Sequence, residues 1–138
     1  MVPGPEASQL VEEAYRAWNE GGPRAFVEFA TEDVELHDVP ELPDAQEWVG
    51  RDAVVARLED VVASTGGRWA EVEDIQPIAD EVLVSLTWRL DRASATLASV
   101  YHVVRIENGR IAQVRVFLEE GAATRAALGG GGAEGRSG

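Results

Sequence analysis

Hydrophobic residues in the first third of the chain recur with the period of an α-helix. They stand three and four positions apart and leave glutamate and arginine residues on the other side, which predicts an amphipathic helix beginning near Ser8. Gly21-Gly22 ends this pattern, and Pro23 suits the first turn of a second, short helix. The apolar positions of the two helices are Leu10, Val11, Ala14, Tyr15, Trp18, Phe26 and Phe29.

Residues 34–38 alternate strictly between the two sides of an extended chain. This alternation predicts a short strand with Val34, Leu36 and Asp38 on one face. The prolines and acidic residues of 39–49 predict a loop, in which Trp48 is placed to close over a ligand. A third helix is expected to follow and to end before the glycine pair at 66–67.

From residue 68 the apolar pattern changes to a period of two, which indicates β-strands. Four strands are expected, at 68–75, 81–90, 96–106 and 110–118. The sequence Glu107-Asn108-Gly109 is a strong hairpin turn between the last two. The alternating positions expected to face the core are Val82, Val84, Leu86, Trp88, Leu90, Ala112, Val114, Val116 and Leu118.

The order of elements predicts one α+β domain, with a curved antiparallel sheet in the second half and an apolar pocket between sheet and helices. A length of 138 residues suits a single domain. The domain is expected to span residues 8–128 and to end in a short helix. Residues 1–7 are expected to be flexible, and the glycine-rich residues 129–138 to be a disordered tail.

Composition removes several classes of function. The net charge is −13, with 25 acidic residues against 12 basic ones, so binding to a nucleic-acid backbone is not expected. Every basic residue is arginine, which excludes Schiff-base chemistry and a Walker-type phosphate loop, and the absence of cysteine excludes thiolate chemistry. The N-terminus does not resemble a signal peptide and no segment is apolar enough to cross a bilayer, so we predict a cytoplasmic protein that binds no membrane.

Four stretches of this sequence resemble the nuclear transport factor 2-like superfamily, and within it the SnoaL-like group of polyketide cyclases and ketosteroid isomerase-like proteins. These stretches are residues 17–22, 34–38, 48–54 and 101–111, and the likeness as a whole covers roughly Ser8 to Leu128. The resemblance implies a cone-shaped fold in which a curved sheet wraps around the helices, often in a homodimer, and leaves a deep pocket. Members include enzymes and non-catalytic proteins, so function has to be argued from the site.

Asp38 is the first candidate for chemistry. It continues the face of Val34 and Leu36, and a carboxylate that points into an apolar cavity is a candidate general base. The resemblance places Asp38 at the position of the proton-shuttling aspartate of ketosteroid isomerase. The alternative is a structural role, because an aspartate followed by Val39-Pro40 at the end of a strand is a common turn former.

Two tyrosines are candidates for donating a hydrogen bond to a developing enolate. The resemblance to ketosteroid isomerase places Tyr15 one residue away from the oxyanion-binding tyrosine of the first helix. Tyr101 replaces the aspartate of the late strand. The alternative for each is a half-buried core aromatic whose hydroxyl group has a partner.

The two histidines are expected to lie off the pocket. Strand parity turns His37 away from Asp38 and places His102 on the mixed face of the sheet with Arg89 and Arg115. Because a metal site needs several converging ligands, we predict no metal and no other cofactor.

Two functions fit these features. The first is a cofactor-independent acid-base enzyme of the isomerase, cyclase or hydrolase type that acts on a hydrophobic small molecule. The second is a non-catalytic module that binds a small ligand or forms a homodimer through the mixed face, where Thr87, Arg89, His102, Arg115 and Phe117 gather. For Trp18 and Trp88, plain core packing is the default role. The residues expected to contact a ligand are Trp18, Trp48, Leu86, Trp88, Val114, Val116 and Leu118.

Overall fold

A computed structural model of the chain describes residues 5–38, 46–66, 68–91 and 96–129. Its helical elements are α1 (Pro5–Phe26), the short 3-10 helix η1 (Val27–Phe29), α2 (Arg51–Thr65) and α3 (Glu120–Leu128). Its strands are β1 (Ala30–His37), β2 (Glu47–Val49), β3 (Trp69–Ile78), β4 (Glu81–Arg89), β5 (Thr96–Glu107) and β6 (Arg110–Phe117). No helix in these ranges is long and apolar enough to cross a membrane.

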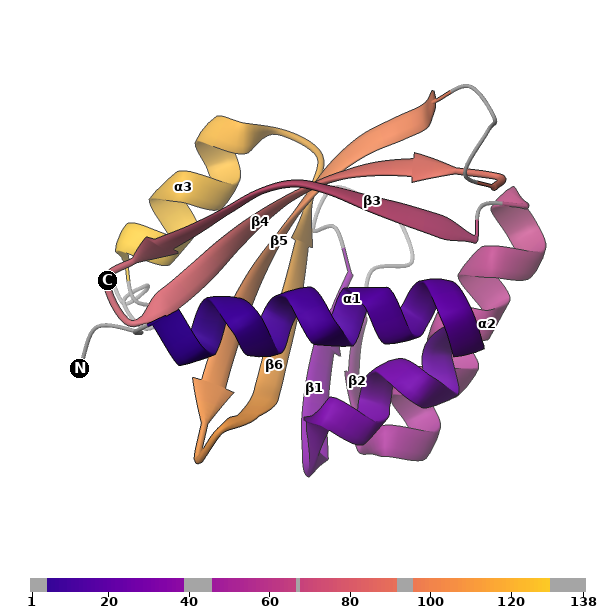
Figure 1. Cartoon of the computed structure of the whole chain (residues 1–138), viewed down its shortest axis with the longest axis horizontal. Coiled ribbons are helices and arrows are strands. Elements are labelled where there is room, and N and C mark those ends of the chain that lie inside the picture. The colour runs from indigo at the N-terminus through magenta and orange to yellow at the C-terminus, as the bar shows by residue number, and fades with distance from the viewer. Residues whose placement is uncertain (1–4, 39–45, 67, 92–95, 130–138) are drawn as a thin grey trace.

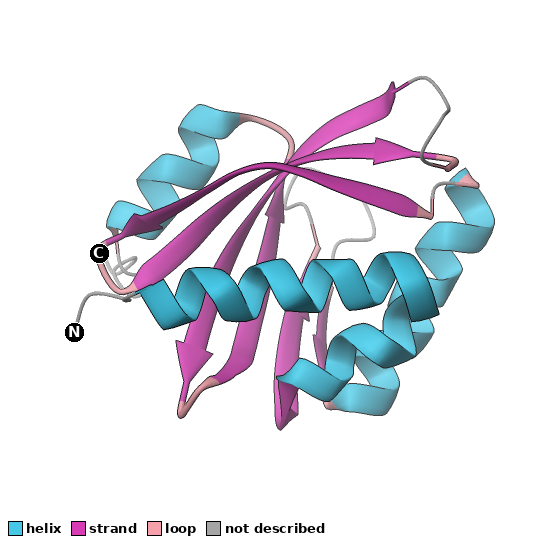
Figure 2. Ribbon diagram, in the orientation of Figure 1, coloured by secondary structure: helices cyan, strands magenta, loops and turns pink. Residues whose placement is uncertain are grey.

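The six strands form one curved sheet in the order β2-β1-β6-β5-β4-β3 (Figure 1). All neighbours pair antiparallel except β1 and β6, which are parallel, so the sheet is mixed rather than purely antiparallel. Helices α1 and α2 lie against one face of the sheet, while α3 packs against the opposite face of β4, β5 and β6 (Figure 2). We call these the inner and the outer face. The predicted α+β architecture is confirmed.

Three local features differ from the prediction. Helix α1 begins at Pro5 rather than after Ser8, and the two expected N-terminal helices are joined across a kink at Gly22, whose φ of 80° suits glycine. Part of the predicted loop is strand β2, in which Trp48 pairs with Leu36 of β1. The rest of that loop, residues 39–45, lies outside the described residues, as does the predicted tail from residue 130 on.

Most of the core lies between the helices and the inner face. It consists of apolar side chains from α1, α2 and all the long strands, as period-two and helical patterning predicted. A smaller cluster, formed by Ile78, Leu83 and Val103 with two alanines of α3, lies on the outer face. Fully or nearly buried members of the inner core include Val11, Tyr15, Trp18, Phe26, Val34, Leu36, Val54, Val55, Val82, Val84, Leu86, Val104 and Val114.

Polar contacts fix the part of α1 just before its kink to the edge strand β3 and to Arg68, the residue that precedes β3. The amide group of Asn19 donates to the carbonyl oxygen of Ala70 and accepts from its N–H, both at 2.8 Å. The indole N–H of Trp18 donates to the carbonyl oxygen of Arg68 at 3.1 Å. Because Ala70 is buried, the two Asn19 bonds satisfy backbone groups that water cannot reach, and they hold α1 against the inner face.

Replacing Asn19 with alanine is expected to lower the free energy of unfolding by about 2 kcal/mol, because it leaves a buried N–H and a buried carbonyl without partners. Urea unfolding followed by circular dichroism measures the change. Arg16→Ala, which alters an exposed position of the same helix, is the control and is expected to stay within about 0.5 kcal/mol of the parent. Equal effects of the two substitutions would contradict this role.

Candidate functional site

A hydrogen bond joins the centre of α1 to the centre of the sheet. The Tyr15 hydroxyl oxygen lies 2.6 Å from Nδ1 of His102, and the ring centroids are 5.8 Å apart. Tyr15 is only 3% exposed and packs against Phe26, whereas the His102 side chain keeps part of its surface accessible. The pair is a polar contact in otherwise apolar surroundings.

The register of the sheet places His102 on the inner face. It stands opposite Val84 of β4 and Val116 of β6, both of which face the helices. The prediction that His102 lies with Arg89 and Arg115 on the other face is therefore wrong. The register shifts by one residue between β5 and β6 near Ile106, and such a bulge moves every following pair to the next row.

Tyr101 lies on the outer face, opposite Ser85 and Phe117. It is half-buried and packs with Phe117 against the cluster beneath α3. Neighbouring residues of a strand point to opposite faces, so His102 takes the inward place that Tyr101 was expected to occupy. The structure brings Tyr15 together with His102 and not with Tyr101.

Burial keeps both members of the pair uncharged at neutral pH. It raises the pKa of the Tyr15 hydroxyl above its ordinary value and lowers the pKa of His102 from 6.5 to about 4. In each case removal from water disfavours the charged form. The site therefore presents a neutral imidazole backed by a neutral phenol.

Four neighbouring side chains on the inner face are only partly buried: Trp88, Val100, His102 and Val116. We call them the inner-face patch. Val100 lies one step along β5 from His102 on the same face, and Val116 lies directly opposite His102. The patch is an accessible apolar surface with one polar group in it.

The other predicted wall residues have different environments. Leu86 and Val114 are buried in the core, and Trp18 packs against the rings of Phe26 and Trp88 with centroid distances of 6.1 and 5.4 Å. Leu118 follows the end of β6 and is 54% exposed, so it does not line the inner face. Leu90 likewise lies beyond β4 and is 46% exposed, because both positions fall outside the paired strands.

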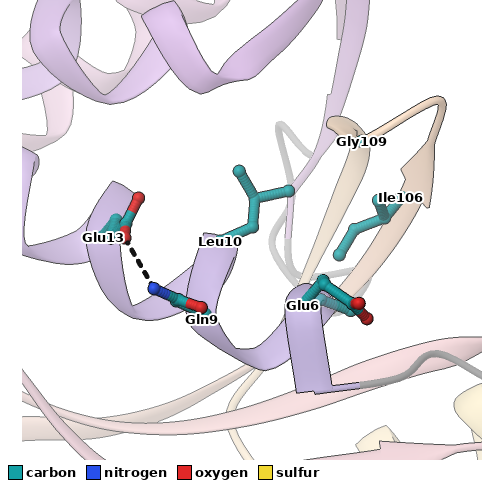
Figure 3. Close-up of a pocket in the computed structure, with 7 residues that line it drawn as sticks. Glu6, Gln9, Leu10, Glu13, Ile106 and Gly109 are labelled. Carbon is teal, nitrogen blue, oxygen red and sulfur yellow. Dashed lines mark hydrogen bonds between the residues drawn. The ribbon is translucent and has the colours of Figure 1, made fainter.

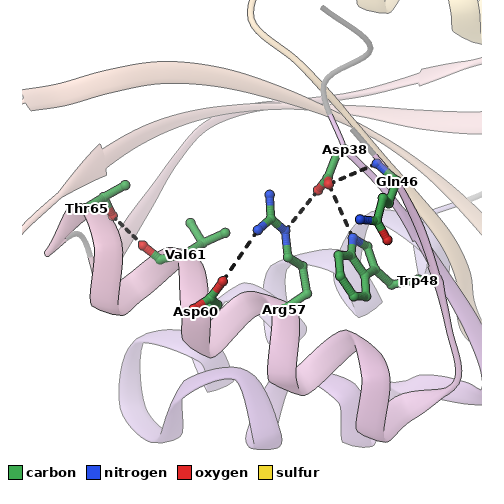
Figure 4. Close-up of polar contacts among 7 residues, drawn as sticks. All are labelled: Asp38, Gln46, Trp48, Arg57, Asp60, Val61 and Thr65. Atoms are coloured by element: carbon green, nitrogen blue, oxygen red, sulfur yellow. Dashed lines mark hydrogen bonds and ion pairs between the residues drawn. The ribbon is translucent and has the colours of Figure 1, made fainter. Parts of the chain in front are cut away.

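Asp38 follows the last residue of β1 and is held by three donors (Figure 4). Its carboxylate accepts hydrogen bonds from the Gln46 backbone N–H at 3.2 Å, the Trp48 indole N–H at 3.3 Å and the Arg57 Nε at 3.2 Å. The Arg57 guanidinium also lies over the Trp48 ring, 5.6 Å from its centroid. With only 7% of its side chain exposed, Asp38 joins β1, β2 and α2.

Two surface hollows lie at other places. One, of about 430 Å³, lies between α1 and the β5–β6 hairpin and is lined by Glu6, Ala7, Gln9, Leu10, Glu13, Ile106 and Gly109 (Figure 3). The other, of about 530 Å³, lies between β2 and α2 and is lined by Trp48, Ala56, Arg57, Glu59, Asp60 and Ala63. Of the residues expected to contact a ligand, Trp48 alone lines one of these two hollows.

The outer face carries charged side chains in pairs. His37 lies there as predicted, 3.0 Å from Glu35, and its hydrogen bond lowers the pKa of the Glu35 carboxyl. Glu81 is buried and pairs with Arg115, and its burial raises the pKa of its carboxyl. Arg89 pairs with Glu71 at 2.9 Å. These groups already have partners within the chain.

Comparison with solved structures identifies chains that share this fold. Bal32a, from a soil-derived mobile gene cassette, is 21% identical with a TM-score of 0.69, covering 86% of this chain and 92% of that one. A provisionally assigned polyketide cyclase from Sinorhizobium meliloti is 16% identical with a TM-score of 0.63, covering 82% and 99%. A provisionally assigned SnoaL-like isomerase from Agrobacterium tumefaciens is 18% identical with a TM-score of 0.64, covering 84% and 99%.

At these identities the solved structures show the fold alone. No curated protein sequence matches this chain. The model of the SnoaL-like domain family, by contrast, matches residues 11–114, a span that runs from α1 into β6 and contains Tyr15, Asp38 and His102. The chain belongs to the SnoaL-like domain family.

Proposed function

We propose that this protein binds a small, largely apolar molecule at the inner-face patch, with His102 in contact with the polar group of that molecule. One observation carries the proposal. On the inner face of β3 to β6, His102 is the only polar side chain among the paired residues that the structure describes. The other paired inner positions are Ala70, Val72, Ile75, Pro77, Val82, Val84, Leu86, Trp88, Ala98, Val100, Val104, Ile106, Ile111, Val114 and Val116.

Physical chemistry supports binding at this surface. Burying apolar area contributes about 25 cal/mol per Å², so a flat ligand that covers Trp88, Val100 and Val116 gains affinity from contact alone. A single polar group within such a surface orients a ligand. Membership of the SnoaL-like family supports the same proposal, since chains that share this fold are provisionally assigned as a polyketide cyclase and an isomerase, which act on small molecules.

The second candidate function is a cofactor-independent acid-base enzyme of the isomerase, cyclase or hydrolase type, with Asp38 as the base. The pairs Leu36–Val114 and His37–Arg115 place Asp38 next to the row of Val116 and His102. Because neighbouring strands lie about 4.8 Å apart, roughly 10 Å separates the backbone at Asp38 from that at His102. A ligand of naphthalene size spans that gap. The three donors on Asp38 favour the structural alternative instead.

The homodimer and the cytoplasmic location remain proposals. The outer face keeps Thr87, Arg89, Arg115 and Phe117 of the predicted dimer surface but not His102, and α3 covers part of it. Self-association through what is left of this face is compatible with its alternating charges.

Ligand binding can be tested with 2-tetralone, a flat apolar ketone, titrated into ¹⁵N-labelled protein. We expect the largest chemical-shift changes at Trp88, Val100, His102 and Val116. Val100→Asp is expected to weaken binding at least tenfold, because it places a charge in the apolar patch. Ser99→Asp changes the neighbouring, outward-facing residue and is expected to keep the affinity. Shifts confined to the hollow beside Trp48 and Arg57 would refute the proposed site.

The enzyme candidate can be tested by hydrogen-deuterium exchange at the carbon beside the carbonyl of 2-tetralone in D₂O. If Asp38 is the base, the protein accelerates exchange, and Asp38→Asn lowers the rate by about 100-fold. Asp60→Asn, which alters an exposed partner of Arg57, is expected to keep the rate. If exchange at saturating ketone is no faster than in buffer, the enzyme candidate is refuted and ligand binding without catalysis is the function that stands.

The neutral state of His102 predicts a pH dependence of stability. The pKa of His102 is about 4 in the folded chain and 6.5 in its ordinary state, so the unfolded chain binds the proton first as the pH falls. The neutral imidazole of His102 therefore costs the folded chain no stability well above pH 6.5, and the free energy of unfolding falls as the pH drops from 6.5 towards 4. Between pH 7 and pH 4.5 the parent is expected to lose about 2 kcal/mol more than His102→Gln, measured by urea unfolding. Parallel pH profiles would contradict a neutral, buried imidazole.

A further inference from the structure

The direction of the Tyr15–His102 hydrogen bond follows from the protons available. His102 is the one hydrogen-bond partner of the Tyr15 hydroxyl among the described residues, and Tyr15 is almost fully buried. If Nδ1 of His102 carried the ring proton and donated it, the phenol proton would be left without an acceptor in the core. Such an unmet buried donor is costly, so Tyr15 donates and Nδ1 accepts.

This direction fixes the other ring nitrogen. A neutral imidazole carries one proton, so with Nδ1 as the acceptor the proton is on Nε2. Nε2 has no hydrogen-bond partner among the described residues. The buried polar atoms without a partner in the described part of the chain are Thr31 Oγ1, Arg51 Nε, Arg105 Nε and Arg115 Nε. Since Nε2 of His102 has no partner and is not in this set, it is not fully buried. The Nε2–H group is therefore an unused donor that retains access from outside the core.

The surroundings of His102 determine which ligand groups can take a hydrogen bond from this N–H. Its sheet neighbours Val84, Val100 and Val116 are apolar. The carboxylate of Asp38, at the end of β1, already accepts hydrogen bonds from three donors and is not free for a ligand. An ammonium group placed there would lose its water without compensation. A carbonyl oxygen would instead receive one N–H bond and leave the rest of the ligand in apolar contact.

We propose that His102 Nε2–H makes the inner-face patch selective for ligands with an acceptor oxygen, such as a ketone or quinone carbonyl, and that Tyr15 is the positioning residue that fixes this tautomer. The inference rests on the proposed function, since it assumes that ligands bind at the patch. It goes further by naming the ligand class and the role of Tyr15.

The tautomer can be measured without any ligand, from the ¹⁵N chemical shifts of the His102 ring. We expect an unprotonated Nδ1 and a protonated Nε2 in the parent chain at pH 7. In Tyr15→Phe the tautomer with the proton on Nδ1 is expected to gain population, a change that loss of packing alone does not produce. Tyr101→Phe removes a phenol from the outer face and is the matched control, expected to leave the ring shifts unchanged. A protonated Nδ1 in the parent chain would overturn the inference.

Selectivity can be measured with three probes on one carbon skeleton: 2-tetralone, tetralin and 2-aminotetralin. In the parent chain we expect the ketone to be favoured and the protonated amine to bind weakest. His102→Phe, which keeps an aromatic ring but removes the donor, is expected to lower the preference for ketone over hydrocarbon about fivefold. Tyr15→Phe is expected to lower it less, and Tyr101→Phe not at all.

The outcomes separate the two proposals. If ketone and hydrocarbon bind at the patch with a preference that His102→Phe does not alter, the inference is wrong and the proposed binding function stands. If none of the three probes binds at the patch, the proposed function fails and the inference fails with it. Thermal unfolding of each variant shows that the comparison is made between folded proteins.

Discussion

The hydrogen bond between Tyr15 and His102 joins the middle of the long helix to the middle of the curved sheet, and the site depends on it. A net contribution of about 1 kcal/mol is typical of such a bond. Its absence would cost more, because a buried hydroxyl would lose its partner within an apolar core. The bond therefore restricts how α1 can lie on the inner face. With Asn19, one turn further along, bonded to β3, α1 is attached to the sheet at two points.

Neutrality is what makes this polar pair compatible with its surroundings. Burial disfavours both the tyrosinate and the imidazolium form, as the pKa changes of the two groups show. The charged residues of this acidic chain are arranged differently. Glu81, Arg115, Glu35 and His37 lie on the outer face, where each has an oppositely charged or hydrogen-bonding partner. The inner face of β3 to β6 is thus free of charged side chains among its described pairs, which suits an apolar ligand.

Periodicity was sufficient to predict the helices, the four long strands and the α+β class, because helical and period-two patterns extend over many residues. It predicted Tyr15 and Trp88 on the inner side for the same reason. It failed at His102 because both Val103 and Val104 of β5 are apolar and buried, so β5 does not reveal its own parity. Counting back from the Asn108-Gly109 turn without a bulge pairs His102 with Arg115. The observed one-residue shift pairs it with Val116 instead.

Strand β2 and the exposure of Leu118 were missed because sequence pattern shows neither a very short strand nor the last paired residue of a long one. A three-residue strand is too short to show a period, and pairing with β1 rather than local sequence fixes Trp48. The donors around Asp38 come from β2, the residue before it and α2, so no spacing along the chain predicts them. Asp38 itself was predicted with both a catalytic and a structural role, and its contacts are those of a residue that joins elements.

The central claim is that an apolar ligand with an acceptor oxygen binds at the inner-face patch against His102. A crystal structure of the protein with 2-tetralone tests it most directly. The account predicts the ketone oxygen within about 2.7–3.2 Å of His102 Nε2, with the ring system against Trp88, Val100 and Val116. A ketone bound only in the hollow beside Trp48 and Arg57, with His102 uncontacted, would contradict it.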